Sequence, residues 1–117
     1  MPHVVLEGRV TIDQCQAGFE PFVHRDGDRL IKVDRFYRER DGRAALIETL
    51  VSEAGHTQKF FIQLSPKGEG ITVRLEPLTD PEKTPAVKRA LAVLAHRIRT
   101  ATGCAYGRTN LEEFLIP

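Results

Sequence analysis

The chain has 117 residues, of which 41% are hydrophobic and 28% are charged, and its formal net charge is +1. This length and composition are typical of a soluble globular protein, so we expect residues 1–117 to form a single domain. The longest apolar run, 90–95, is far shorter than the ~20 residues that a membrane span requires, and no apolar leader follows the N-terminus. We therefore expect a cytoplasmic protein with no membrane partner.

The first predicted element is a strand over residues 3–12, where apolar and polar side chains alternate. Val4 and Leu6 lie on the apolar side of this strand, and Arg9 lies on the polar side. Residues 13–18 have no clear period, which predicts a loop or a single helical turn.

Phe19 and Phe22 mark a short apolar patch or an edge strand, because Pro21 cannot donate a ladder hydrogen bond. The following segment, 24–29, contains an Asp-Gly dipeptide that is typical of a tight turn. Its two aspartates are too few for a calcium loop, so we interpret the segment as a turn alone.

Asp-Gly at residues 41–42 predicts a hairpin between strands at 30–40 and 43–52. A two-residue turn fixes which residues face each other across the two strands. The expected pairs are Tyr37 with Leu46, Arg35 with Glu48, Val33 with Leu50, and Phe36 with Ile47.

Further strands are predicted at 56–64 and 71–76, joined by a flexible loop at 65–70. This loop contains Lys67 and two glycines but lacks the spacing of a phosphate-binding loop. The expected pairs are Ile47 with Ile62, Leu64 with Ile71, and Lys59 with Glu76. One face of the sheet then becomes almost entirely apolar, with Phe36, Ala45, Ile47, Phe60, Ile62, Leu64, Ile71, Val73 and Leu75.

The longest predicted element is a helix from Thr84 to Gly103, with Thr84 as the N-cap and Gly103 as the terminating residue. Its apolar stripe consists of Val87, Leu91, Leu94, Ile98 and Ala101, and Val93 is the one apolar residue on the opposite, basic arc. The sequence therefore predicts an α+β fold: an antiparallel β-meander of about five strands with one long C-terminal helix packed across one face.

The basic arc of this helix is the first candidate surface. Six Lys or Arg residues and no Asp or Glu occur between residues 83 and 111, which is a charge pattern suited to an anionic partner. The alternative is a solvated helix face whose cations favour the C-terminal end of the helix dipole. The residues concerned are Lys88, Arg89, Arg97 and Arg99.

The second candidate surface is the sheet face opposite the helix. Cations and aromatic rings are interleaved there, as in domains that bind single-stranded nucleic acid. The candidate ligand-binding residues are Arg9, Arg35, Tyr37, Lys59, Phe61 and Arg74. Cross-strand ion pairs that solvate the sheet are the alternative interpretation of these cations.

The same face also predicts a homodimer, because it carries an apolar patch that is too large to leave in water. The residues of this patch are Ile31, Val33, Tyr37, Leu46 and Leu50. We expect a binding or interaction domain that is homodimeric and works through this face.

The C-terminal tail is apolar, and Asn110 with Glu113 has the spacing of a capping box. We expect the tail to dock on its own domain, and donation to a neighbouring subunit is the alternative. Cys15 and Cys104 match no zinc or disulfide pattern and are expected to be buried free thiols.

An enzyme is the minority hypothesis from the sequence. The four histidines lie on different elements without metal-ligand spacing, and no Gly-rich dinucleotide motif is present, so no metal and no cofactor are predicted. The alternative function is a small enzyme or accessory subunit with a site near the end of the helix, at Cys104, Tyr106 and Arg108.

Overall fold

The computed structural model describes residues 1–117 as seven strands, two α-helices and one 3₁₀ helix. The strands are β1 His3–Glu7, β2 Phe22–Asp26, β3 Arg29–Arg38, β4 Ala45–Glu53, β5 His56–Lys67, β6 Gly70–Leu75 and β7 Ala105–Thr109. The helices are α1 Ile12–Ala17, α2 Pro85–Thr102 and the 3₁₀ helix η1 Glu112–Phe114.

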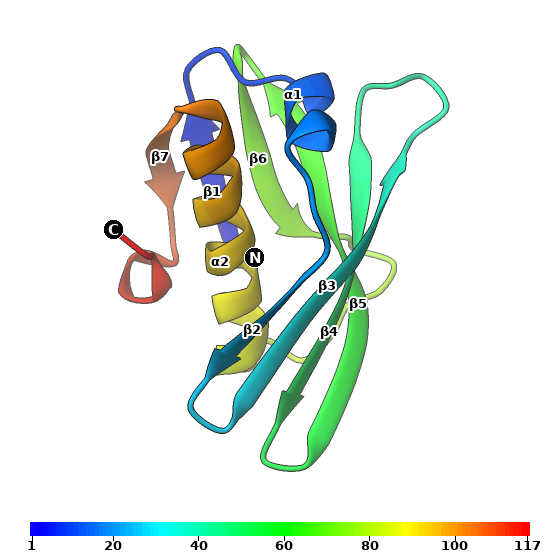
Figure 1. The fold of residues 1–117 in the computed structure, drawn as a ribbon, viewed down its shortest axis with the longest axis vertical. Coiled ribbons are helices and arrows are strands. Elements are labelled where there is room, and N and C mark those ends of the chain that lie inside the picture. Colours follow the sequence, from blue (N-terminus) through cyan, green and yellow to red (C-terminus); the bar gives the residue numbers. More distant parts are fainter.

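All strands belong to one antiparallel sheet with the order β2-β3-β4-β5-β6-β1-β7. The sheet curls into a half-barrel, and α2 packs inside the curl (Figure 1). The predicted α+β class, with one long helix against an antiparallel sheet, is confirmed. The sheet has two more strands than predicted, because β2 is a full edge strand and β7 adds to the free side of β1.

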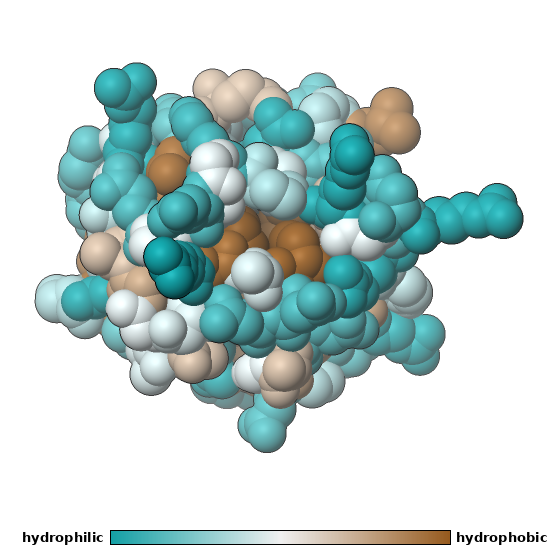
Figure 2. All heavy atoms as spheres, turned by 90° about the horizontal axis from the view of Figure 1, so that it is seen from above, coloured by the Kyte–Doolittle hydropathy of each residue, from teal (hydrophilic) through white to brown (hydrophobic).

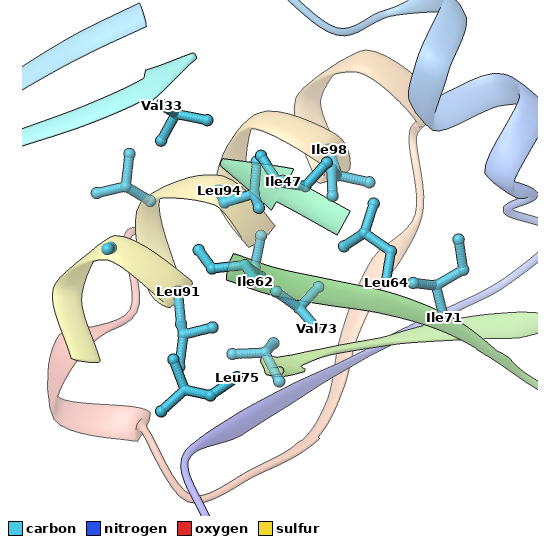
Figure 3. Close-up of a cluster of buried hydrophobic side chains, with 14 of the residues drawn as sticks. Val33, Ile47, Ile62, Leu64, Ile71, Val73, Leu75, Leu91, Leu94 and Ile98 are labelled. Carbon is cyan, nitrogen blue, oxygen red and sulfur yellow. The ribbon is translucent and has the colours of Figure 1, made fainter. Parts of the chain in front are cut away.

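Helix α2 begins and ends where the sequence predicts. The Thr84 side chain accepts a hydrogen bond from the amide of Val87 at 3.3 Å, and Gly103 adopts the left-handed conformation with φ 76°. Its buried face meets the sheet in the core shown in Figure 3, where Leu91 and Leu94 lie among strand residues. No helix of the structure is long and apolar enough to cross a membrane.

Val93 is 2% exposed, although the helical period places it on the basic arc. Helix α2 contacts the sheet on several sides and also contacts η1, so nine of its 18 residues are buried. A helix inside a curled sheet therefore buries a wider surface than a helix lying on a flat one.

A β-bulge in β3 changes the predicted β3–β4 register. Tyr37 pairs with Leu46 as predicted, but Val33 pairs with Thr49 instead of Leu50. The extra residue on β3 lies between these two pairs, and it reverses the side on which the earlier residues of the strand lie. Ile31 and Val33 consequently point into the core, where both are 0% exposed.

The predicted register is correct for the β4–β5 hairpin and wrong for the β5–β6 hairpin. Ile47 pairs with Ile62 as predicted. Leu64 pairs with Val73 instead of Ile71, because the strands extend to Lys67 and Gly70 and the turn is two residues long. A shift of two residues keeps every side chain on its face, so the predicted apolar face survives the error.

The N-terminal strand is shorter than predicted and ends at Glu7. The residues after it form α1, whose N-terminus has a reciprocal capping box between Thr11 and Gln14 with hydrogen bonds of 3.0 and 3.1 Å. The segment 13–18 is therefore helical for most of its length, as one of the two predicted alternatives proposed.

The predicted capping box at Asn110 is wrong. The Asn110 side chain accepts from the amide of His3 at 3.0 Å and donates to the carbonyl of Met1 at 2.7 Å, so it joins the two chain ends. Docking of the tail on its own domain is confirmed, since the Tyr106 hydroxyl donates to the carbonyl of Ile116 at 2.6 Å.

Candidate functional site

The sheet face opposite α2 lacks the apolar patch from which a homodimer was predicted. The β3 bulge buries Ile31 and Val33, and only Tyr37, Leu46 and Leu50 remain on the outer side. Of these three, Tyr37 is 43% exposed and the two leucines are half-buried. The prediction of a patch too large to leave in water is therefore wrong.

Five of the cations and rings predicted as ligand-binding share this outer face. The rings of Tyr37 and Phe61 meet edge to face with 6.1 Å between their centres. The pKa of Arg35 is raised above its ordinary value, first by a hydrogen bond with the Tyr37 side chain and then by nearby negative charge, including that of Glu48. Lys59 lies opposite Leu50 on the neighbouring strand.

Arg74 lies on the same outer face, opposite Gln63 of β5, whereas Arg9 does not join this group. Arg74 donates to the Gln63 side chain at 2.7 Å, and Gln63 donates to Glu76 at 3.3 Å. Glu76 is thus engaged by Gln63, and the predicted Lys59–Glu76 pair is replaced. Arg9 follows the end of β1 and lines a separate hollow with Arg38.

The cations of α2 are neither freely solvated nor paired mainly with acids, because aromatic rings hold most of them. The guanidinium of Arg97 lies 3.8 Å from the centre of the Phe22 ring, and the Lys88 ammonium lies 5.9 Å from the Phe114 ring. Arg89 is 3.4 Å from a carboxylate oxygen of Asp26 and donates to the carbonyl of Phe114. These contacts join α2 to β2 and to the C-terminal tail.

Arg99 makes the corresponding contact at the end of the helix, with its guanidinium carbon 4.6 Å from the ring centre of Tyr106. Cys104 connects α2 to β7 and is half-buried, and Arg108 is exposed on β7. We call Arg99, Cys104, Tyr106 and Arg108 the helix-end cluster. Cys104, Tyr106 and Arg108 were predicted together because they are neighbours in the chain, and the fold brings Arg99 against Tyr106.

Burial first, and the charge of Cys104 second, raise the pKa of the Cys15 thiol to about 12. The two cysteines therefore lie near each other, although 89 positions separate them. Cys15 is buried as predicted, whereas Cys104 is only half-buried. No group of three or more His, Cys, Asp or Glu side chains gathers with the geometry of a metal site.

Two curated proteins resemble this chain. The tRNA (guanine-N(7)-)-methyltransferase of Thermotoga maritima is 31% identical over 103 residues, which cover 88% of this chain and 32% of that enzyme. The chain is similar to part of an enzyme. A tRNA (guanine-N(7)-)-methyltransferase of Aquifex aeolicus is 36% identical over 50 residues, which cover 43% of this chain and 17% of the enzyme. The chain thus spans about a third or less of the curated relatives that it matches. No protein-family model matches the chain, and no solved structure matches it.

These similarities correct two predictions. The chain was expected to be a homodimeric binding domain working through the outer sheet face, with an enzyme as the minority hypothesis. Both similar proteins are enzymes, and the apolar patch behind the dimer prediction is absent. The alternative, an enzyme or accessory subunit with a site near the end of α2, agrees better with these findings.

The aromatic partners of the helix cations were missed from the sequence. Phe22 and Arg97 are 75 positions apart, and Lys88 and Phe114 are 26 apart, so no local pattern joins them. The one available signal was that several cations and several aromatic residues occur on elements flanking the same helix. Their pairing depends on how far the sheet curls, which residue spacing does not specify.

Proposed function

We propose that this chain works within a tRNA-modifying enzyme, as an accessory part that holds the tRNA backbone at the helix-end cluster. The observation that carries the proposal is the 31% identity to the Thermotoga maritima methyltransferase across 88% of the chain. Because the chain spans about a third of that enzyme, we assign the methylation of tRNA to the assembly in which the chain works.

The charge of the chain segment that carries the helix-end cluster supports a phosphate ligand. No Asp or Glu occurs in the sequence from Lys83 to Leu111, which includes the whole cluster. Arg99 and Arg108 supply guanidinium groups, whose planar forks match phosphate oxygens. Contacts to the phosphate backbone provide most of the sequence-independent affinity of proteins for nucleic acid.

The stacking of Arg99 on Tyr106 prepares the arginine for this role. A guanidinium that lies over a ring keeps the N–H groups at its edge available, while the ring restricts its motion. Tyr106 is in turn held by its hydrogen bond to Ile116. Less conformational entropy is then lost when a phosphate binds, which strengthens binding.

A titration with an unmodified tRNA transcript tests the proposal. We expect Arg99→Gln and Arg108→Gln each to weaken binding roughly five-fold, since each removes one charged contact to phosphate. Lys59→Gln is the matched control, because it removes an exposed cation from the outer sheet face and should leave the affinity within two-fold. Equal losses in all three variants would refute a site at the helix end.

The link to tRNA modification has its own test. In cells that make this protein, deletion of its gene should lower the amount of N7-methylguanine in bulk tRNA, measured by mass spectrometry of nucleosides. An unchanged amount would separate the chain from the reaction that the similar proteins catalyse, whatever its affinity for tRNA.

A further inference from the structure

A second site is a cavity of about 370 Å³ between α1, strands β2 to β5 and the last turns of α2, and no member of the helix-end cluster lines it. Pockets for small molecules commonly measure about 300–1,000 Å³. Figure 2 views the molecule from the end where α1 and the C-terminal end of α2 lie, and it shows a recessed apolar area ringed by hydrophilic side chains. We propose that this cavity binds a small amphipathic anion, with the apolar body of a medium-chain carboxylate inside and its head group at Arg97.

The lining of the cavity defines the apolar half of this ligand. Nine of the fifteen lining residues are hydrophobic. Three are the phenylalanines Phe19, Phe22 and Phe36, and the floor includes Ile47 and Leu64, which are both 0% exposed. Removing an apolar chain from water against such a surface is favourable in proportion to the apolar area that is buried.

The two lining threonines are already engaged, and the Nδ1 atom of His96 is the one buried polar side-chain atom of the lining without a hydrogen-bond partner. The hydroxyl of Thr100 donates to the carbonyl of His96 at 3.0 Å, and the hydroxyl of Thr102 donates to the carbonyl of Ile98 at 2.8 Å. A nucleobase placed here would leave several of its edge groups without partners, which weakens its binding. The cavity therefore favours an aliphatic body over a base.

Arg97 defines the charged half of the ligand. Its side chain is exposed at the cavity, it makes no salt bridge, and its guanidinium lies 3.8 Å from the ring centre of Phe22. The ring holds the guanidinium at the cavity while its N–H edge stays available for a carboxylate. Glu20 is the only other Asp, Glu, Lys or Arg in the lining. Its charge opposes an anion, so replacing it should strengthen binding.

Calorimetric titration with decanoate, below its micelle concentration, tests the proposal on the full chain. Decylamine and decanol carry the same apolar chain with a cationic or a neutral head group, so they serve as matched ligands. We expect decanoate to bind with one-to-one stoichiometry and at least ten-fold more tightly than decylamine. Equal or tighter binding of decylamine would overturn the role of Arg97.

Single substitutions test whether decanoate binds in this cavity. Arg97→Gln should weaken decanoate roughly ten-fold and leave decanol unchanged, and Glu20→Gln should tighten decanoate two- to three-fold. Lys88→Gln is the control, because it removes a ring-stacked cation from the same helix outside the cavity. Decanoate binding that responds equally to Arg97→Gln and Lys88→Gln would show a general charge effect and refute the site.

A cavity-filling variant completes the test. Ala101 is exposed on α2 and lines the cavity, so Ala101→Trp should occupy the space and abolish binding of both decanoate and decanol. Its helix content by circular dichroism should match that of the wild type. Undiminished decanoate binding in this variant, or competition by guanosine monophosphate as strong as by decanoate, would contradict the proposed ligand.

Discussion

The guanidinium of Arg99 on α2 lies 4.6 Å from the ring centre of Tyr106 on β7. This contact joins the last turn of the long helix to the strand that follows it, across the left-handed residue Gly103. It places a cation at the edge of the sheet with its hydrogen-bonding groups free of carboxylate partners. The proposed tRNA contact depends on this arrangement.

Two substitutions at Tyr106 should separate its ring from its hydroxyl. Tyr106→Phe keeps the ring under Arg99 and removes the hydrogen bond to Ile116, so we expect a loss of about 1 kcal/mol in the free energy of unfolding. Its affinity for tRNA should stay within two-fold. Tyr106→Ala should weaken tRNA binding several-fold, because Arg99 loses its support. Urea denaturation and tRNA titration measure the two effects, and equal tRNA affinity in both variants would exclude a role for the ring.

Removing the negative charge of Glu7 tests whether tRNA binds beside it. The only glycine of β7, Gly107, leaves room for the Glu7 side chain, which lies so close that an added Cβ would be 2.5 Å from its carboxylate oxygen. A negative charge beside the cluster repels phosphate, so Glu7→Gln should strengthen tRNA binding by up to about three-fold at low salt. Weaker binding in this variant would mean that the phosphate contacts lie elsewhere.

Because of the β3 bulge, replacing Ile31 or Leu50 by alanine should destabilise the fold to different extents. A regular hairpin would place these two residues on the same face and predict similar losses. Ile31 is 0% exposed, and its replacement by alanine should lower the free energy of unfolding by about 2–4 kcal/mol. Leu50 lies half-buried on the outer face, and Leu50→Ala should cost about 1 kcal/mol. Denaturant unfolding compares them, and similar costs would argue against the bulge.

Those same residues show how far the sequence determines the fold. Alternation and turn dipeptides suffice for the class, the long helix and the apolar face of β4, β5 and β6, because these depend on local chemistry. Nothing in the sequence from Leu30 to Arg38 distinguishes a bulged strand from a regular one. The single extra residue turns the side chains of Ile31 and Val33 from the outer face into the core, which removes the predicted dimer surface.

The site was predictable only where its members are neighbours in the chain. Cys104, Tyr106 and Arg108 were grouped because they follow the helix end directly. Strand β7 was missed because the sequence AYGRT has little apolar alternation, and its pairing with β1 joins residues about 100 positions apart. The contact between Arg99 and Tyr106 exists only once β7 turns back along the helix.

Cys15 predicts a loss of stability at high pH. An unfolded thiol loses its proton near pH 9.0, whereas the native thiol keeps its proton up to about pH 12, because burial disfavours the thiolate. The unfolded state therefore binds fewer protons between these values, and the contribution of Cys15, which is complete below pH 9.0, is lost as the pH rises toward 12.

Unfolding free energies measured from pH 8 to 11 in the wild type and in Cys15→Ala test this prediction. Above pH 9 the wild type should lose stability more steeply than the variant, by up to about 1.4 kcal/mol per pH unit. All other side chains are common to both proteins, so the difference between the two curves reports on position 15. Parallel curves would show that the Cys15 thiol is not shielded from water.

The salt dependence of tRNA binding tests the central claim most directly. Each phosphate contact contributes about one unit to the slope of log affinity against log salt concentration. We predict that the Arg99→Gln/Arg108→Gln double variant lowers this slope by about two relative to the wild type, while Lys59→Gln leaves it unchanged. An unchanged slope in the double variant, or an equal decrease with Lys59→Gln, would contradict tRNA binding at the helix-end cluster.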